Sequence, residues 1–156
     1  ISVEIVSLVE RVVERFRPQA DLQQVALLVE HPSLGDEELT LLVDPFRVEQ
    51  IVNNLIANAM HYTPASGKII ITIAAEKGDV NIRVRDNGPG IPSDALPHIF
   101  ERFYRADRAR SRSSGGSGLG LAIARNLAEA HGGVLEAANH PAGGAIFTLK
   151  LPLGDE

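Results

Sequence analysis

The 156-residue sequence contains no cysteine and no tryptophan. Without cysteine it can form neither a disulfide nor a thiolate metal site, which suits a reducing compartment. It has no apolar run near the roughly 20 residues of a membrane span. Its formal net charge of −5 does not favour binding to nucleic acid. The length fits a single domain over residues 1–156 with a buried core.

The first residue is Ile1 rather than methionine. We therefore expect the chain to be a piece of a larger protein. We expect no signal peptide within this sequence, although the larger protein could still be bound to a membrane.

Hydrophobic periodicity divides the sequence into helices and strands. It predicts three amphipathic helices, over residues 3–16, 45–62 and 118–131. The first should end near Pro18 and the second should be capped by Asp44. β-rich runs predict six strands, at residues 25–30, 39–43, 68–75, 80–86, 134–138 and 145–151. This order predicts an α/β two-layer sandwich, with about three helices on one face of a mixed β-sheet.

Two asparagines, Asn54 and Asn58, lie four residues apart on the second predicted helix. Residues at this spacing share a helix face. Amide oxygens can ligate Mg²⁺, a hard cation that prefers oxygen ligands. Two surface amides without a ligand explain the pair alone equally well.

Asp86 ends a predicted strand and enters the turn Asn87-Gly88-Pro89-Gly90. A carboxylate on a rigid turn can accept a hydrogen bond from an exocyclic amine such as that of adenine. The glycines would let a flat ring approach the backbone. Taken alone, an ordinary Asp-Asn-Gly turn is the simpler interpretation.

Gly116, Gly118 and Gly120 precede the last predicted helix. Backbone N–H groups at a helix start, together with the helix dipole, bind phosphate. The spacing resembles a dinucleotide fingerprint only superficially, because no strand precedes it, and the lysine of a P-loop is missing. A flexible helix cap is the alternative.

Residues 87–117 show no sustained period, and a loop of this length in a compact domain is usually functional or disordered. Its second half contains four arginines, at positions 105, 108, 110 and 112. The guanidinium fork suits polyphosphate, although a solvated charged loop explains most of them. His61 and Tyr62 end the asparagine-bearing helix and are either core or rim residues or face a ligand held by Asn58.

In this order, the segments resemble the catalytic, ATP-binding domain of bacterial sensor histidine kinases. That domain has the Bergerat (GHKL) fold, which it shares with gyrase, the MutL repair proteins and certain heat-shock chaperones. The resemblance covers Val3 to Leu153. It rests on four motifs: an asparagine box at 54–64, a first glycine box at 86–92, a phenylalanine box at 99–105 and a second glycine box at 116–121.

The resemblance implies that the chain binds ATP and Mg²⁺. Asn58 would hold the metal, with Asn54 beside it as a catalytic residue that ligates the metal or orients water. Asp86 would bind the adenine amino group. The other positions implied to contact the nucleotide are His61, Tyr62, Gly88, Gly90, Ile91, Gly116, Gly118, Leu119, Gly120 and Thr148.

The resemblance also implies a lid over residues 101–117, which would be mobile and order when nucleotide binds. Arg105 would reach the terminal phosphate from this lid as a catalytic cation, and Phe100 and Phe103 would pack its base. His61 departs from the family pattern, because many members carry lysine or arginine there.

The phosphoacceptor segment of the family, a histidine followed by an acid in a helical hairpin, is missing. The resemblance therefore implies a monomeric fragment that donates the γ-phosphate to a separate dimerisation and phosphoacceptor domain of the same kinase. A response regulator would act downstream. The fragment itself would be a cytoplasmic domain of a parent protein in the inner membrane.

Other functions fit parts of the pattern. An ATPase of the gyrase or MutL type places a glutamate at the position of Asn54 to activate water, and an amide cannot act as that base. A non-catalytic nucleotide-binding or partner-docking module remains open. A serine kinase of the anti-sigma type shares the fold, but the extended lid and phenylalanine box favour the histidine kinases.

Overall fold

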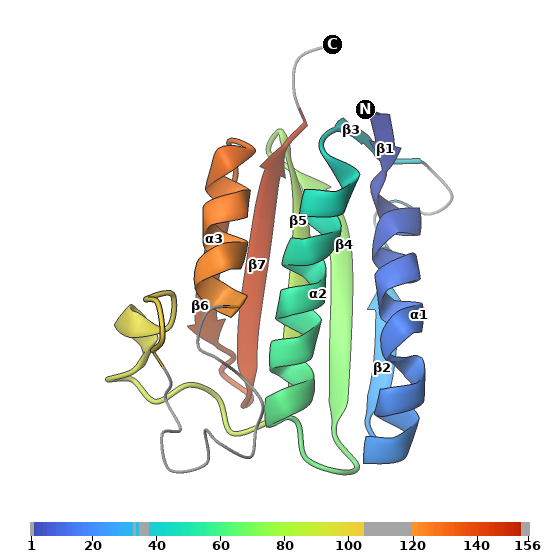
Figure 1. Ribbon diagram of the computed structural model, residues 1–156. Helices are drawn as coiled ribbons and strands as arrows, with labels where there is room; N and C mark the ends of the chain where they lie inside the picture. The colour runs from blue at the N-terminus through green and yellow to red at the C-terminus, as the bar shows by residue number, and fades with distance from the viewer. Residues whose placement is uncertain (1, 33, 35–37, 105–119, 154–156) are drawn as a thin grey trace.

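The computed structural model describes residues 2–32, 34, 38–104 and 120–153 (Figure 1). Its helices are α1 (Ile5–Gln23), α2 (Pro45–Tyr62) and α3 (Gly120–Ala130), with a short 3-10 helix η1 (Leu96–His98). Its strands are β1 (Ser2–Glu4), β2 (Ala26–Glu30), β3 (Thr40–Leu42), β4 (Lys68–Glu76), β5 (Asp79–Asp86), β6 (Val134–Asn139) and β7 (Ala145–Pro152). The three α-helices lie side by side over one face of the larger sheet, which confirms the predicted two-layer sandwich.

The larger sheet has the strand order β2-β4-β5-β7-β6. β2 pairs with β4 in parallel, and the other three pairs are antiparallel, so the sheet is mixed as predicted. The predicted hairpin of residues 68–75 and 80–86 is confirmed as β4 and β5. Alternate residues of β5 and β7 turn toward the helices and are buried. Asp86 ends β5 on this buried side.

The N-terminal segment differs from the prediction. Residues 3 and 4 were predicted to be helical, but Ser2–Glu4 forms β1, which pairs with β3 in a separate two-stranded sheet. The predicted end of this helix near Pro18 was also wrong, because α1 continues to Gln23. A proline removes one helical hydrogen bond. Burial of Ala20 beyond it holds the helix, which stops only where Gln24 adopts φ 61°.

Glu4 caps α1. Its carboxylate accepts hydrogen bonds from the backbone N–H groups of Val6 and Ser7, both at 3.0 Å, and from that of Leu39 at 3.3 Å. Burial opposes ionisation of Glu4, but the hydrogen bonds from Ser7, Val6 and Leu39 outweigh it and lower the pKa of the carboxyl below its ordinary 4.5. The Glu4 carboxylate therefore stabilises both the start of α1 and the segment that leads into β3.

Replacing Glu4 with glutamine should lower the free energy of unfolding at pH 7 by about 1 kcal/mol, the usual effect of losing a cap. Because the folded-state pKa is lowered, the charged cap contributes fully above pH 4.5 and is lost as the pH falls through the lowered value. Urea unfolding at pH 7 and at pH 3 should show the difference from wild type shrinking with acid. Glu10→Gln on the exposed face of α1 is the control, and an equal loss there would contradict the capping role.

Candidate functional site

The helix α2 holds both predicted asparagines. Asp44 caps it, accepting from Phe46 N at 3.0 Å and Arg47 N at 3.4 Å, and Pro45 occupies its first turn. Its apolar stripe is fully buried against the sheet and the neighbouring helices. Asn54 and Asn58 are half-buried at the edge of this stripe, so a ligand beside α2 can reach both.

Asn54 connects α2 to the start of α3. Its Nδ2 donates a 3.0 Å hydrogen bond to the carbonyl oxygen of Gly120. The asparagine box and the described end of the second glycine box therefore lie against each other. Gly120 is the first residue of α3, and backbone N–H groups at a helix start can bind an anion.

Asp86 supplies the carboxylate of the predicted site and is buried, at 3% exposed. Its Oδ1 accepts hydrogen bonds from Gly88 N at 2.9 Å and Ala145 N at 3.3 Å. Within the described part of the chain, both of its hydrogen bonds end on Oδ1. Oδ2 makes no hydrogen bond to the described residues, so it could accept one from a bound ligand.

Gly88 joins the first glycine box to the end of α2. A Cβ added there would lie 2.5 Å from the carbonyl oxygen of Tyr62 and 3.2 Å from Asp86 Oδ1. No residue with a side chain fits without moving α2 or Asp86. The end of α2 thus lies beside the end of β5, whereas the start of α3 lies against the middle of α2, at Asn54 (Figure 1).

Two site residues were missed by the sequence analysis. Asn139 at the end of β6 holds the backbone of Ile91 on both sides, accepting from Ile91 N at 2.7 Å and donating to Ile91 O at 2.8 Å. Gly144 has φ +90°, and a Cβ there would collide with the carbonyl of Asp86. In the sequence, Asn139 and the Gly143-Gly144 pair give only a turn signal, because their partners lie about 50 residues away.

Thr148 is not brought to this site. It lies on β7 opposite Arg83 of β5 and Glu136 of β6. Buried residues alternate along β7, so Thr148 belongs to the face of the sheet away from the helices, whereas Asp86 ends β5 on the buried face. Its assignment to the nucleotide rested on the family resemblance and did not consider this alternation, and we leave Thr148 out of the proposed pocket.

His61 is exposed and meets the ring of Tyr62 edge-on, with 4.6 Å between the ring centroids. Gly90 has φ +82° and lies against Asn139, which also binds the backbone of the next residue, Ile91. Asn139 therefore holds both of these residues of the first glycine box. The remaining predicted site residues, Arg105, Gly116, Gly118 and Leu119, lie outside the described residues, as does the lid beyond residue 104.

The phenylalanine box is only partly packed. Phe100 contacts the ring of Phe147 edge-to-face at 6.2 Å between centroids, and the guanidinium of Arg125 lies 5.3 Å from its ring. Phe103 is 68% exposed and has φ 64°. Phe103 is therefore not packed into the described part of the domain, and its predicted packing against the lid concerns residues outside the described ones.

The described residues contain no group of three or more histidine and acidic side chains that could hold a metal ion. A divalent cation at this site would therefore depend on amide oxygens and on oxygens of the ligand. The half-buried amides of Asn54 and Asn58 offer such oxygens and suit Mg²⁺, which binds few protein groups and keeps several waters. None of the helices in the described residues is long and apolar enough to cross a membrane.

Comparison with known families matches residues 43–155 to the model of the histidine kinase-, DNA gyrase B- and HSP90-like ATPases. The chain is 51% identical over 110 residues to the signal transduction histidine-protein kinase AfsQ2 of Streptomyces coelicolor, covering 70% of this chain and 20% of AfsQ2. It is 43% identical over 117 residues to BaeS of Escherichia coli, covering 75% of this chain and 25% of BaeS. The matched region thus spans a quarter or less of these relatives.

Several solved structures of histidine kinases are similar in fold to this chain. The nucleotide-free catalytic domain of the histidine kinase ThkA has a TM-score of 0.85 at 27% identity, covering 97% of this chain and 94% of that one. Full-length ShkA in complex with AMPPNP has a TM-score of 0.84 at 33% identity, covering 97% of this chain and 30% of ShkA. ThkA in complex with the response regulator TrrA has a TM-score of 0.82 at 26% identity, covering 99% of this chain and 42% of that chain.

Proposed function

The chain belongs to the family of histidine kinase-, DNA gyrase B- and HSP90-like ATPases, and from this we propose that it is the ATP-binding catalytic domain of a sensor histidine kinase. The observation that carries the proposal is Asp86. Its carboxylate is buried and is held through Oδ1 by two backbone N–H groups, and its Oδ2 makes no hydrogen bond to the described residues. A buried acceptor on a glycine turn suits the amino group of adenine.

The adenine pocket would lie between Asp86, Gly88 and the end of α2. Gly88 has no room for a side chain because its backbone packs against the Tyr62 carbonyl and Asp86, and this packing would fix the turn that carries Asp86 beside the end of α2. Tyr62 is half-buried at the end of α2 and would flank the adenine or ribose. Ile91, fixed by Asn139, and Gly90 would form the rim.

The phosphates would lie along α2 toward α3. Asn58 would ligate Mg²⁺ and Asn54 would stand beside it, because the Asn54 amide already touches Gly120 at the start of α3. When bound, the metal neutralises charge on the phosphates, which is the main need of phosphoryl transfer. We propose Gly116, Gly118 and Leu119 as further phosphate contacts, with Arg105 and His61 as cations of the rim.

The whole activity would need parts beyond this chain. The chain spans 20% of AfsQ2 and 25% of BaeS. We propose that its phosphoacceptor is a histidine on a dimerisation domain of the same kinase and that a response regulator receives the phosphate. The ThkA complex with TrrA supports that partner class, and the ShkA complex with AMPPNP supports the nucleotide. The parent would be a membrane sensor with this domain in the cytoplasm.

Hydrolysis of ATP without transfer, as in the gyrase type of ATPase, is disfavoured by Asn54. Its amide donates to Gly120 O, and an amide has no basic site with which to activate water.

Calorimetric titration with a non-hydrolysable ATP analogue, with and without Mg²⁺, tests the proposal. Wild type should bind more tightly with Mg²⁺. Asn58→Ala should lose this gain, weakening binding by at least about tenfold, the lower end of the effect seen even for outer-shell partners of a metal. The control is Asn53→Ala, which removes the amide side chain one residue before Asn54 on the same helix. This variant should bind the analogue as wild type does. Magnesium-dependent binding that survives Asn58→Ala would contradict the metal assignment.

A further inference from the structure

β2 is an edge strand of the five-stranded sheet and pairs only with β4 among the described residues. Ala26 N donates to Gly67 O at 3.0 Å. In a parallel ladder, alternate residues direct their backbone groups to the same neighbour. Residues 26, 28 and 30 therefore face β4, whereas Leu27 and Val29 direct their N–H and C=O groups to the outer edge.

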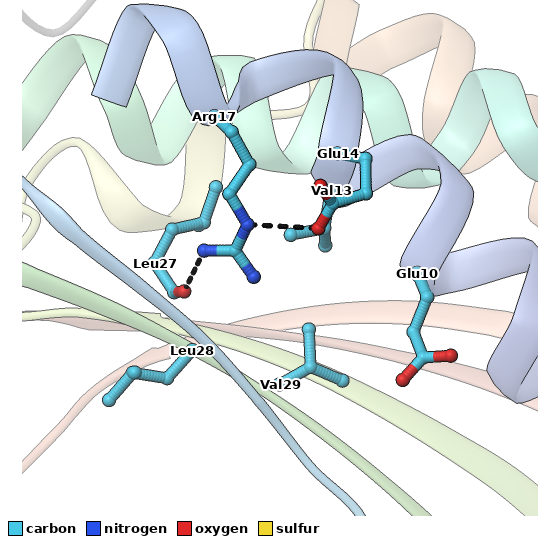
Figure 2. A pocket seen from close by; sticks show the side chains of 7 residues that line it. All are labelled: Glu10, Val13, Glu14, Arg17, Leu27, Leu28 and Val29. Atoms are coloured by element: carbon cyan, nitrogen blue, oxygen red, sulfur yellow. Dashed lines mark hydrogen bonds and ion pairs between the residues drawn. The ribbon is translucent and has the colours of Figure 1, made fainter. Parts of the chain in front are cut away.

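One of these outward groups is occupied. Arg17 of α1 donates from Nη1 to Leu27 O at 2.6 Å, and its Nε lies 2.9 Å from Glu14 Oε2 (Figure 2). Within the described part of the chain, Leu27 N and both backbone groups of Val29 make no hydrogen bond. An edge with such groups is a template for another strand.

A groove runs along this edge, between one face of α1 and β2, with a volume of about 540 Å³. Its helix wall is formed by residues at helical spacing, Glu10, Val13, Glu14 and Arg17, and its strand wall by Leu27, Leu28 and Val29 (Figure 2). Val13 is buried at the base, and Leu28 is 41% exposed on the other face of the sheet. An added strand would find aliphatic contacts on both of its faces.

The charge around the groove is negative. Its one cation, Arg17, is paired with Glu14. Glu10 on the helix wall and Glu30 at the end of β2 are exposed and have no ion pair with the described residues. A strand lying along β2 would pass between these two carboxylates, one on each face of the sheet. Lysine or arginine at alternate positions would complement them.

We propose that the β2 edge is a docking site for an extended, basic segment of a partner protein, which binds by strand addition. The segment would pair with the backbone of Leu27 and Val29 and displace the Arg17 side chain from Leu27 O. Main-chain hydrogen bonds supply the affinity in this mode, and alternate side chains supply the specificity. The site is separate from the proposed nucleotide pocket, because none of the pocket residues lines this groove.

The probe is the capped hexapeptide Lys-Val-Lys-Val-Lys-Val, added to the nitrogen-15-labelled chain in residue-resolved amide hydrogen exchange. At a peptide concentration ten times the dissociation constant, exchange at Leu27 and Val29 should slow by about tenfold, as occupancy requires. Exchange at Leu28, which already faces β4, should not change. Equal slowing at all three positions, or none, would overturn strand addition at this edge.

Two comparisons sharpen the test. The hexapeptide Glu-Val-Glu-Val-Glu-Val has the same pattern with opposite charge and should bind at least about tenfold more weakly, or 1.4 kcal/mol. Equal affinity would overturn the basic character of the partner. Val29→Pro removes an outward N–H, which an edge strand tolerates, and should abolish binding while the melting temperature stays close to that of wild type. If this variant unfolds, the exchange pattern in wild type still decides the question.

Discussion

Replacing Asp86 with asparagine should abolish binding of the ATP analogue and leave the fold intact. The substitution keeps Oδ1, which can still accept from Gly88 N and Ala145 N. It changes only the second atom, from an oxygen that accepts a hydrogen bond to an NH₂ group that donates one. An adenine amino group would then face another donor. Loss of a hydrogen bond to a charged group costs about 1.5–3 kcal/mol, and a buried unsatisfied donor adds to this.

The control for this prediction is Asp79→Asn, the same substitution at the opposite end of β5. It should leave nucleotide affinity unchanged. Calorimetry gives the affinities, and circular dichroism with thermal unfolding shows that both variants are folded. Wild-type affinity in folded Asp86→Asn would refute the adenine assignment, and equal losses in both variants would refute its specificity.

The helices and strands that were predicted correctly are those with strong local signals. α2 has an acid cap, a proline in its first turn and a regular apolar period, and its bounds match the prediction. β4 and β5 are long and joined by a two-residue turn. β1 was missed because it has three residues and its partner β3 lies nearly 40 residues away, so only tertiary contact defines it.

The candidate site divides in the same way. Asn54, Asn58, Asp86 and Gly88 could be selected from the sequence because each sits in a short motif with its own turn or helix signal. The residues that fix the geometry of those motifs could not. Asn139 and Ala145 act on Ile91 and Asp86 through contacts about 50 to 60 residues apart in the sequence. Such contacts depend on the register of β5, β6 and β7, which local patterns do not specify.

Replacing Gly144 with alanine should have the largest effect on stability of the changes considered. Gly144 has φ +90°, a conformation that costs an L-residue about 1–2 kcal/mol. Its Cβ would also collide with the carbonyl oxygen of Asp86 and come within 3.0 Å of the Cα of Asn87. These are backbone atoms, so the strand end itself must shift, which adds about 1–3 kcal/mol. We expect the free energy of unfolding to fall by roughly 2–5 kcal/mol in total.

Gly143→Ala is the matched control, because Gly143 has φ +106° and no atom lies within 4 Å of its added Cβ. This variant should show the backbone strain alone. Urea unfolding of the two variants therefore separates strain from collision, and equal losses would contradict the close approach of Gly144 to Asp86. Because that collision moves Asp86, the variant at Gly144 should also bind the ATP analogue more weakly than the variant at Gly143. If the two variants differ in stability but not in affinity for the analogue, the close packing of Gly144 would be supported and the assignment of Asp86 to the nucleotide site would be refuted.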